Sequence, residues 1–222
     1  MTNDLQKRVI FGAIALAIFT PFLLAGGMAF QFFVGLLAMI ATAELIKMRR
    51  LAPNSIEGVL AMLASLVLTL PLQNYLTFLP TDGNYTAYAI VVFLLLGATV
   101  FNIGRYNYSD VVFPIASSFY VGIGFHSLVL ARMDGLNKVF FALCLVWATD
   151  IGAYMIGRQF GRRKLLPKVS PNKTVEGFVG GILSAVVVAI IFLIVDKSLL
   201  AGYSFGMILL LVVIFSIFSQ FG

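Results

Sequence analysis

Long apolar segments, separated only by short polar connections, dominate the chain. A helix that crosses the hydrocarbon core of a bilayer needs about 20 mainly apolar residues. Segments near that length lie at residues 9–24, 28–46, 56–72, 87–101, 111–130, 139–156, 177–195 and 199–218. They predict an all-α, polytopic integral membrane protein with about eight transmembrane helices, forming a single membrane domain over residues 1–222.

Composition excludes a soluble domain. Only 11% of the 222 residues are charged, whereas about 25% are charged in soluble domains. The single Cys144 cannot build a disulfide framework or a cysteine-based zinc site. Two polar residues within the spans are expected to be structural: Glu44, paired with Lys47 or Arg50, and His126, hydrogen-bonded in the packing. Any chemistry must therefore take place in loops or between helices.

Lysines and arginines gather on one side of the predicted membrane. If the N-terminus is cytoplasmic, 12 of the 15 basic residues fall in cytoplasmic segments, and only Arg132, Lys138 and Lys197 fall outside. Cytoplasmic loops of membrane proteins carry such an excess. We therefore expect a multi-pass protein of the cell membrane whose N-terminus, C-terminus and basic loop at residues 157–176 are cytoplasmic.

That loop carries more than orientation charge. It combines cations with the hydroxyls of Ser170 and Thr174, and it ends where Glu176 and Gly177 open the next predicted helix. Helix N-terminal N–H groups favour an anion, and basic side chains beside a membrane bind the phosphates of lipid headgroups or nucleotides. A topology signal needs only Lys and Arg, so the mixture indicates an anion-binding site; plain orientation charge is the alternative. The cations are Arg162, Arg163, Lys164, Lys168 and Lys173.

A carboxylate lies inside the predicted helix that precedes the loop. Asp150 is about two turns before Gly157, and Trp147, Asp150, Tyr154 and Gly157 share one helix face. An ionisable residue within a membrane span is costly and indicates a functional site. Asp150 is therefore a candidate metal ligand or a counter-ion to a basic residue of the loop, with a structural ion pair as the alternative.

Two glycine pairs flank the loop, Gly157 with Gly161 and Gly177 with Gly181. The second pair indicates close helix packing, and such glycine-rich faces leave homodimerisation open. Neither pair has the spacing of a phosphate-binding P-loop.

Taken in order, these residues resemble a known family. The collinear motifs are Trp147-Ala-Thr-Asp150-Ile-Gly-Ala-Tyr154, then Pro167-Lys168, then Ser170-Pro-Asn-Lys173-Thr174-Val-Glu176-Gly177. They resemble phosphatidate cytidylyltransferase (CDP-diacylglycerol synthase), which the first five predicted helices match only in character. The resemblance implies an integral membrane enzyme of phospholipid biosynthesis. It would join CTP and phosphatidate to give CDP-diacylglycerol and pyrophosphate, with a divalent metal, usually Mg²⁺.

The resemblance also implies roles for individual residues. The implied catalytic residues are Asp150, Lys173 and Glu176. The implied substrate-binding residues are Lys168, Ser170, Thr174, Arg162 and Arg163. The expected partners are CTP, phosphatidate and membrane lipids, and not nucleic acid.

The chain departs from the family at its C-terminal end. The family's signature is an acidic cytoplasmic segment that would lie beyond Gly222, and the metal ligands of the family are expected there. Within the sequence Asp150 is the candidate ligand. We therefore expect these 222 residues, as a truncated product or a fragment, to be inactive alone. The alternative function is that of a non-catalytic membrane remnant or a lipid-binding membrane protein.

Overall fold

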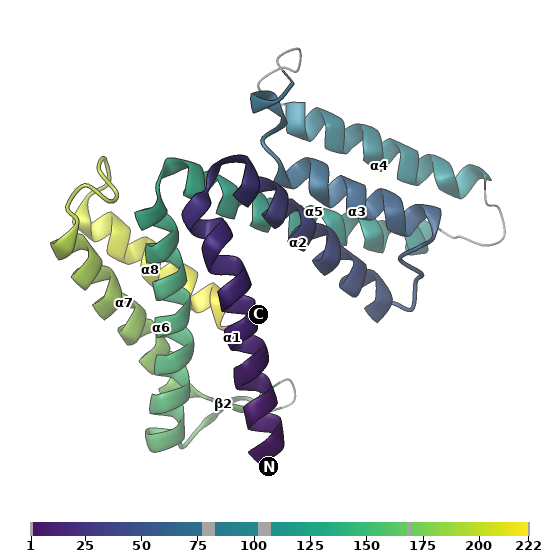
Figure 1. Ribbon diagram of the computed structural model, residues 1–222. Helices are drawn as coiled ribbons and strands as arrows, with labels where there is room; N and C mark the ends of the chain where they lie inside the picture. The colour runs from purple at the N-terminus through teal and green to yellow at the C-terminus, as the bar shows by residue number, and fades with distance from the viewer. Residues whose placement is uncertain (1, 77–82, 102–107, 168–169, 222) are drawn as a thin grey trace. The chain divides into compact units, whose positions relative to one another are not determined.

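The structure is a computed structural model that describes residues 2–76, 83–101, 108–167 and 170–221. The chain forms two compact units, Met1–Leu136 and Asn137–Gly222. Each unit is described by itself, and Figure 1 labels their helices.

In the part of the chain that the structure describes, the first unit is a bundle of five α-helices. Within it α3 packs against α2, α4 and α5. The buried residues Ala64 and Leu68 of α3 pack against Tyr88 of α4 in an apolar cluster. The helices are α1 (Thr2–Ala25), α2 (Gly27–Met48), α3 (Ile56–Thr69), α4 (Gly83–Phe101) and α5 (Tyr108–Asp134), and a short 3₁₀ turn, η1 (Leu72–Asn74), follows α3.

The ends of α3 show why this segment is a helix. Ser55 caps its first turn by accepting a hydrogen bond from the Gly58 N–H at 3.1 Å. The helix stops at Thr69 because Pro71 cannot continue it. The carbonyl of Thr69 lies 3.1 Å from Nδ1 of His126, as expected of a packing histidine. Glu44 likewise pairs with Lys47 at 2.7 Å, as predicted.

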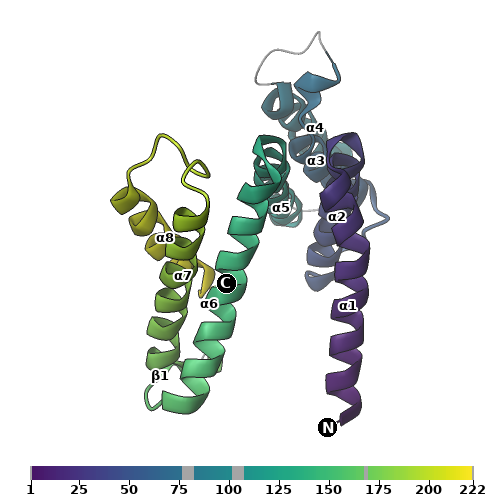
Figure 2. The ribbon, with the colours of Figure 1, turned by 60° about the vertical axis from the view of Figure 1, so that its left-hand side comes forward.

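The described residues of the second unit form three α-helices and a β-hairpin. Figure 2 shows α6, α7 and α8 side by side, with the hairpin at one end of α6 and α7. Its apolar core brings Phe141 of α6 together with Ala185 and Ala189 of α7 and Ile208 of α8. The elements are α6 (Leu136–Phe160), β1 (Lys164–Leu166), β2 (Ser170–Thr174), α7 (Val175–Val195) and α8 (Phe205–Ser219).

Glycines bring the backbones of α6 and α7 into contact. A Cβ added to Gly177 would lie 2.6 Å from the carbonyl of Ala153 and 3.0 Å from Cα of Gly157. A Cβ on Gly180 would lie 2.6 Å from the side chain of Ile156. The close packing predicted from Gly177 and Gly181 is therefore confirmed, and it operates inside one chain.

The helices have the lengths and exposure of a membrane protein. In the described part of the chain, α2, residues 110–134 of α5, α6 and α7 are long and apolar enough to cross a bilayer, and the other helices contain shorter apolar stretches. Only 22% of the most apolar stretch of 18 residues in α7 is buried. An apolar surface of this extent is typical of a helix in a lipid environment. The predicted all-α, polytopic membrane fold is thus confirmed.

Several predicted boundaries differ in the structure. The helix predicted at residues 87–101 begins at Gly83, the one predicted at residues 199–218 begins at Phe205, and the one predicted at residues 9–24 begins at Thr2. The loop predicted at residues 157–176 is partly helical up to Phe160 and then contains the hairpin. The loop's composition gave no sign of strands, because it holds Pro171 and lacks alternation of apolar and polar residues.

Candidate functional site

The hairpin holds the basic segment against the start of α7. Strands β1 and β2 are antiparallel, with Lys164 opposite Thr174 and Leu166 opposite Ser170. The Glu176 carboxylate accepts hydrogen bonds from the main-chain N–H of Arg162 at 3.0 Å and from that of Arg163 at 3.2 Å. The turn between α6 and β1 is therefore tied to the first turn of α7.

Two main-chain N–H groups at the start of α7 already donate hydrogen bonds within the protein. Thr174 is buried and caps the helix, because its Oγ1 accepts the Gly177 N–H at 3.1 Å. The Val175 N–H donates to the carbonyl of Arg163 at 2.9 Å. These two N–H groups are engaged, so recognition of an anion here would depend more on nearby cations than the sequence suggested.

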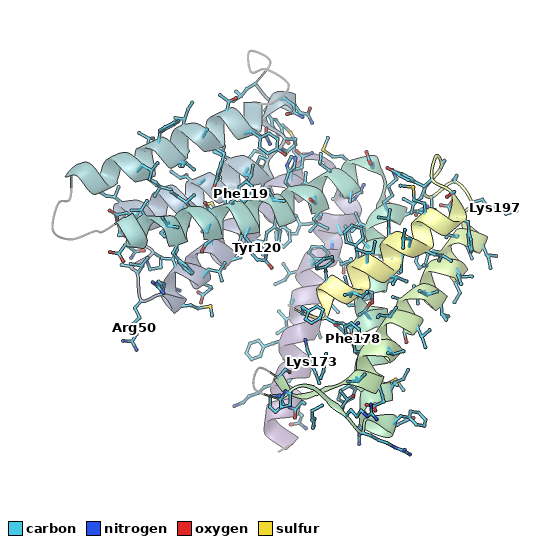
Figure 3. All side chains as sticks on the ribbon, turned by 180° about the vertical axis from the view of Figure 1, so that it is seen from behind. Arg50, Phe119, Tyr120, Lys173, Phe178 and Lys197 are labelled. Carbon is cyan, nitrogen blue, oxygen red and sulfur yellow. The ribbon has the colours of Figure 1, made fainter. Side chains whose placement is uncertain are left out.

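A cleft of about 480 Å³ lies beside this turn. Helix α6, the hairpin, α7 and the end of α8 all contribute to it. Figure 3 shows Lys173 on the hairpin and Phe178 on α7, at the end of the unit opposite Lys197. The lining residues are Asp150, Ala153, Tyr154, Gly157, Arg158, Leu165, Asn172, Lys173, Thr174, Gly177, Phe178, Ser219 and Gln220.

One face of α6 supplies a wall of the cleft. Asp150, Tyr154 and Gly157 line it together, as the helical spacing predicted, whereas Trp147 is not among the lining residues. Arg158 also lines it, and its guanidinium donates to the Tyr154 hydroxyl at 3.4 Å. A carboxylate, a phenol and a guanidinium therefore face the same cleft from consecutive turns of one helix.

Lys173 faces the cleft from β2. Its ammonium group donates a hydrogen bond to the main-chain carbonyl of Gln220, the residue that follows α8. An ammonium group has three donors, so this contact leaves donors for an anion in the cleft.

The structure brings some of the predicted site residues together and separates others. Asp150, Lys173 and Thr174 line the cleft. Ser170 and Glu176 do not line it, and the carboxylate of Glu176 is used by the turn before β1. The side chains of Arg162 and Arg163 are exposed and also lie outside the lining. Lys168 is outside the described residues. The catalytic and substrate-binding roles given to these residues stay predictions.

Sequence reasoning missed the contribution of α8. Ser219 and Gln220 line the cleft although they lie far along the chain from the basic loop. The available signal was a polar pair directly after an apolar run. Such a pair indicates where a helix ends, but not which other segments lie beside that end. Asn172, inside the basic loop, also lines the cleft.

The lining offers limited means of holding a metal. No group of three His, Cys, Asp or Glu side chains is found among the described residues. Among the lining residues, Asp150 supplies a carboxylate and Asn172 an amide oxygen. Magnesium is commonly held by one or two carboxylates together with waters and substrate phosphates. The donor set therefore fits Mg²⁺ that arrives with a phosphate-bearing substrate.

These features define a class of protein: a polytopic membrane protein whose cleft combines cations with a carboxylate and suits phosphate-bearing ligands. Residues 6–222 match the Cytidylyltransferase family, and the chain belongs to it. It is therefore a member of a family of nucleotide-transferring enzymes.

Curated relatives cover nearly the whole chain. A phosphatidate cytidylyltransferase of Staphylococcus haemolyticus is 38% identical over 219 residues, which are 98% of this chain and 82% of the relative. Proteins of the same name from Staphylococcus epidermidis and Staphylococcus aureus are 37% and 34% identical, with the same coverage. The resemblance drawn from the motifs at residues 147–177 is thus confirmed.

Proposed function

We propose that the protein transfers the cytidylyl group of CTP to phosphatidate, giving CDP-diacylglycerol and pyrophosphate. The observation that carries the proposal is the meeting of Asp150, Lys173 and Thr174 in one cleft, in a chain similar to phosphatidate cytidylyltransferases. The cleft adjoins the end of two candidate membrane spans, where the phosphate of a lipid would lie.

The reaction forms one P–O bond and breaks another. An oxygen of the phosphatidate phosphate attacks the α-phosphorus of CTP, and a new P–O–P linkage forms. The bond between that phosphorus and the oxygen bridging to the β-phosphate breaks, and pyrophosphate leaves with the electron pair. Two anions must approach each other, so the site has to supply positive charge before the chemistry can occur.

Cations of the hairpin region are suited to that task. Lys173 and Arg158 line the cleft and would offset phosphate charge, and Thr174 has a hydroxyl proton left to donate because its oxygen is the acceptor in the cap. Arg162 and Arg163 are exposed and are proposed to attract the anionic substrates, and Lys168 and Ser170 are proposed to bind them, as the resemblance implies.

Asp150 is the residue that we propose to hold Mg²⁺. When bound, the ion would supply charge neutralisation to the triphosphate. The resemblance implies a catalytic role for Glu176. Its two hydrogen bonds to main-chain N–H groups favour holding the hairpin in place instead.

The test is a radiolabel assay in detergent, with CTP, phosphatidate and Mg²⁺, on the 222-residue chain and, in parallel, on a version extended by the family's C-terminal segment. Product formation is expected from the extended version, and Lys173→Ala in that version should reduce kcat/KM on the order of 100-fold. Lys197→Ala is the matched control, because Lys197 is exposed at the opposite end of the unit. Phosphatidate binding without product would favour a non-catalytic lipid-binding protein.

We further propose that the N-terminus, the hairpin and the C-terminus are cytoplasmic, on the basis of the bias of Lys and Arg. Labelling of single cysteines at Lys164 and Lys197 with a membrane-impermeant reagent in sealed vesicles should give opposite results. A homodimer stays a prediction. The glycines that suggested it, Gly177 and Gly181, are used in contacts within the chain.

A further inference from the structure

The residue after α8 is held in a socket of main-chain carbonyls. Gln220 is only 7% exposed. Its side-chain Nε2 donates to the carbonyl of Phe178 in α7 at 3.3 Å and to the carbonyl of Ser216 in α8 at 3.2 Å. An amide NH₂ has two donors, so the hydrogen-bonding capacity of this nitrogen is filled.

The socket depends on a glycine of α7. A Cβ added to Gly181 would lie 3.0 Å from Oε1 of Gln220. The ring of Phe221 also packs on Phe178, with centroids 5.9 Å apart. The end of α8 is therefore fixed to α7 by an amide, by close backbone approach and by an aromatic contact.

The main chain of Gln220 in turn holds a cation of the cleft. Its carbonyl accepts the hydrogen bond from the Lys173 ammonium. Lysine has a long, flexible side chain, and fixing it costs conformational entropy. A carbonyl that is itself immobile lowers the number of positions that this ammonium can adopt.

We propose that Gln220 is a positioning residue of the cleft: its side-chain amide fixes the end of α8 so that its carbonyl holds Lys173 at the cleft wall. The inference rests on the proposed function for the identity of the anion that Lys173 meets. The mechanical part, the hold of Gln220 on Lys173, stands on the hydrogen bonds alone.

The first experiment needs no activity. The rate at which Lys173 is modified by an amine-reactive reagent is followed by mass spectrometry in the full-length protein in detergent. Gln220→Glu keeps the size of the side chain but replaces the two donors by an acceptor that faces two carbonyls. Modification of Lys173 should become several-fold faster in this variant, whereas Gln159→Glu, an exposed glutamine of α6, should leave the rate unchanged. An unchanged rate in folded Gln220→Glu protein overturns the proposal.

The second experiment separates positioning from general packing. Gln220→Glu should lower kcat/KM roughly 10- to 100-fold, the range expected from losing hydrogen bonds to a charged group. In a Lys173→Ala background the same change should have little further effect, because residues that act through one contact are not additive. Losses that multiply would show that Gln220 acts independently of Lys173.

The two experiments also separate this proposal from the proposed function. If the wild-type protein makes no CDP-diacylglycerol, the proposed reaction is wrong, and the modification rate still decides whether Gln220 holds Lys173. If product forms and the Lys173 rate does not respond to Gln220, the reaction stands and the positioning role falls.

Discussion

Glu176 reaches back across the hairpin to Arg162, whose main-chain N–H donates to its carboxylate at 3.0 Å. The two residues are separated by the whole of β1 and β2. A carboxylate at the beginning of a helix also interacts favourably with the helix dipole. Glu176 thus links the turn after α6 to the first turn of α7.

Replacement of Glu176 should loosen that turn. In Glu176→Ala the N–H groups of Arg162 and Arg163 lose their acceptor. Limited trypsin digestion should then cut after Arg162 or Arg163 several-fold faster than in the wild type. Glu44→Ala is the control, because its partner Lys47 is exposed and an exposed pair contributes at most about 1 kcal/mol. Equal digestion rates would remove Glu176 from this structural role.

The glycine contact between α6 and α7 should be intolerant of a methyl group. In Gly177→Ala the added Cβ would lie 2.6 Å from the carbonyl of Ala153. Because this neighbour is backbone, the helices must move apart, and overpacking of this kind costs about 1–3 kcal/mol. Gly97→Ala in α4 has nothing within 4 Å of the new Cβ. The thermal midpoint in detergent should fall for Gly177→Ala and be kept or raised for Gly97→Ala.

Hydropathy and spacing predicted the parts of the structure that depend on local sequence. The apolar segments became helices, Pro71 ended α3, and Asp150 and Tyr154 came to one cleft because helical spacing fixes their common face. These outcomes follow from the period of the helix and from the chemistry of single residues. The chain forms two compact units. The single membrane domain over residues 1–222 stays a prediction.

The remaining parts of the site depend on contacts between distant segments. The hairpin has strands of three and five residues, too short for a periodic signal. The contact from Lys173 to Gln220 joins residues 47 apart in the chain. No local pattern encodes such a contact, since it arises from the way α7 and α8 pack. The sequence pointed to the basic loop and could not show that the end of α8 completes the cleft.

Thr174 should tolerate only a residue that keeps its hydroxyl. It caps α7 and lines the cleft, so Thr174→Val loses the acceptor for the Gly177 N–H while keeping nearly the same shape. Loss of such a cap costs about 1 kcal/mol, and the thermal midpoint should fall. Thr174→Ser should restore most of the stability and of the product formation. If Thr174→Val and Thr174→Ser have the same thermal midpoint and form product equally, the hydroxyl contributes neither to stability nor to product formation.

Asp196 should make the connection between α7 and α8 sensitive to acid. Hydrogen bonds from the Ser198 hydroxyl at 2.6 Å, the Ser198 N–H and the Asn137 side chain lower the pKa of the Asp196 carboxyl below its ordinary value. A lowered pKa in the folded state means that the contribution to stability is present above the unfolded-state pKa of about 4. It is then lost as the pH falls through the lower folded-state value.

At pH 7 Asp196→Ala should therefore lower the thermal midpoint slightly, and the difference from the wild type should shrink below about pH 4. Ser198→Ala removes the main donor and should reproduce part of the effect at pH 7. A difference that stays constant down to pH 2 would show that the ionised carboxylate does not stabilise this connection.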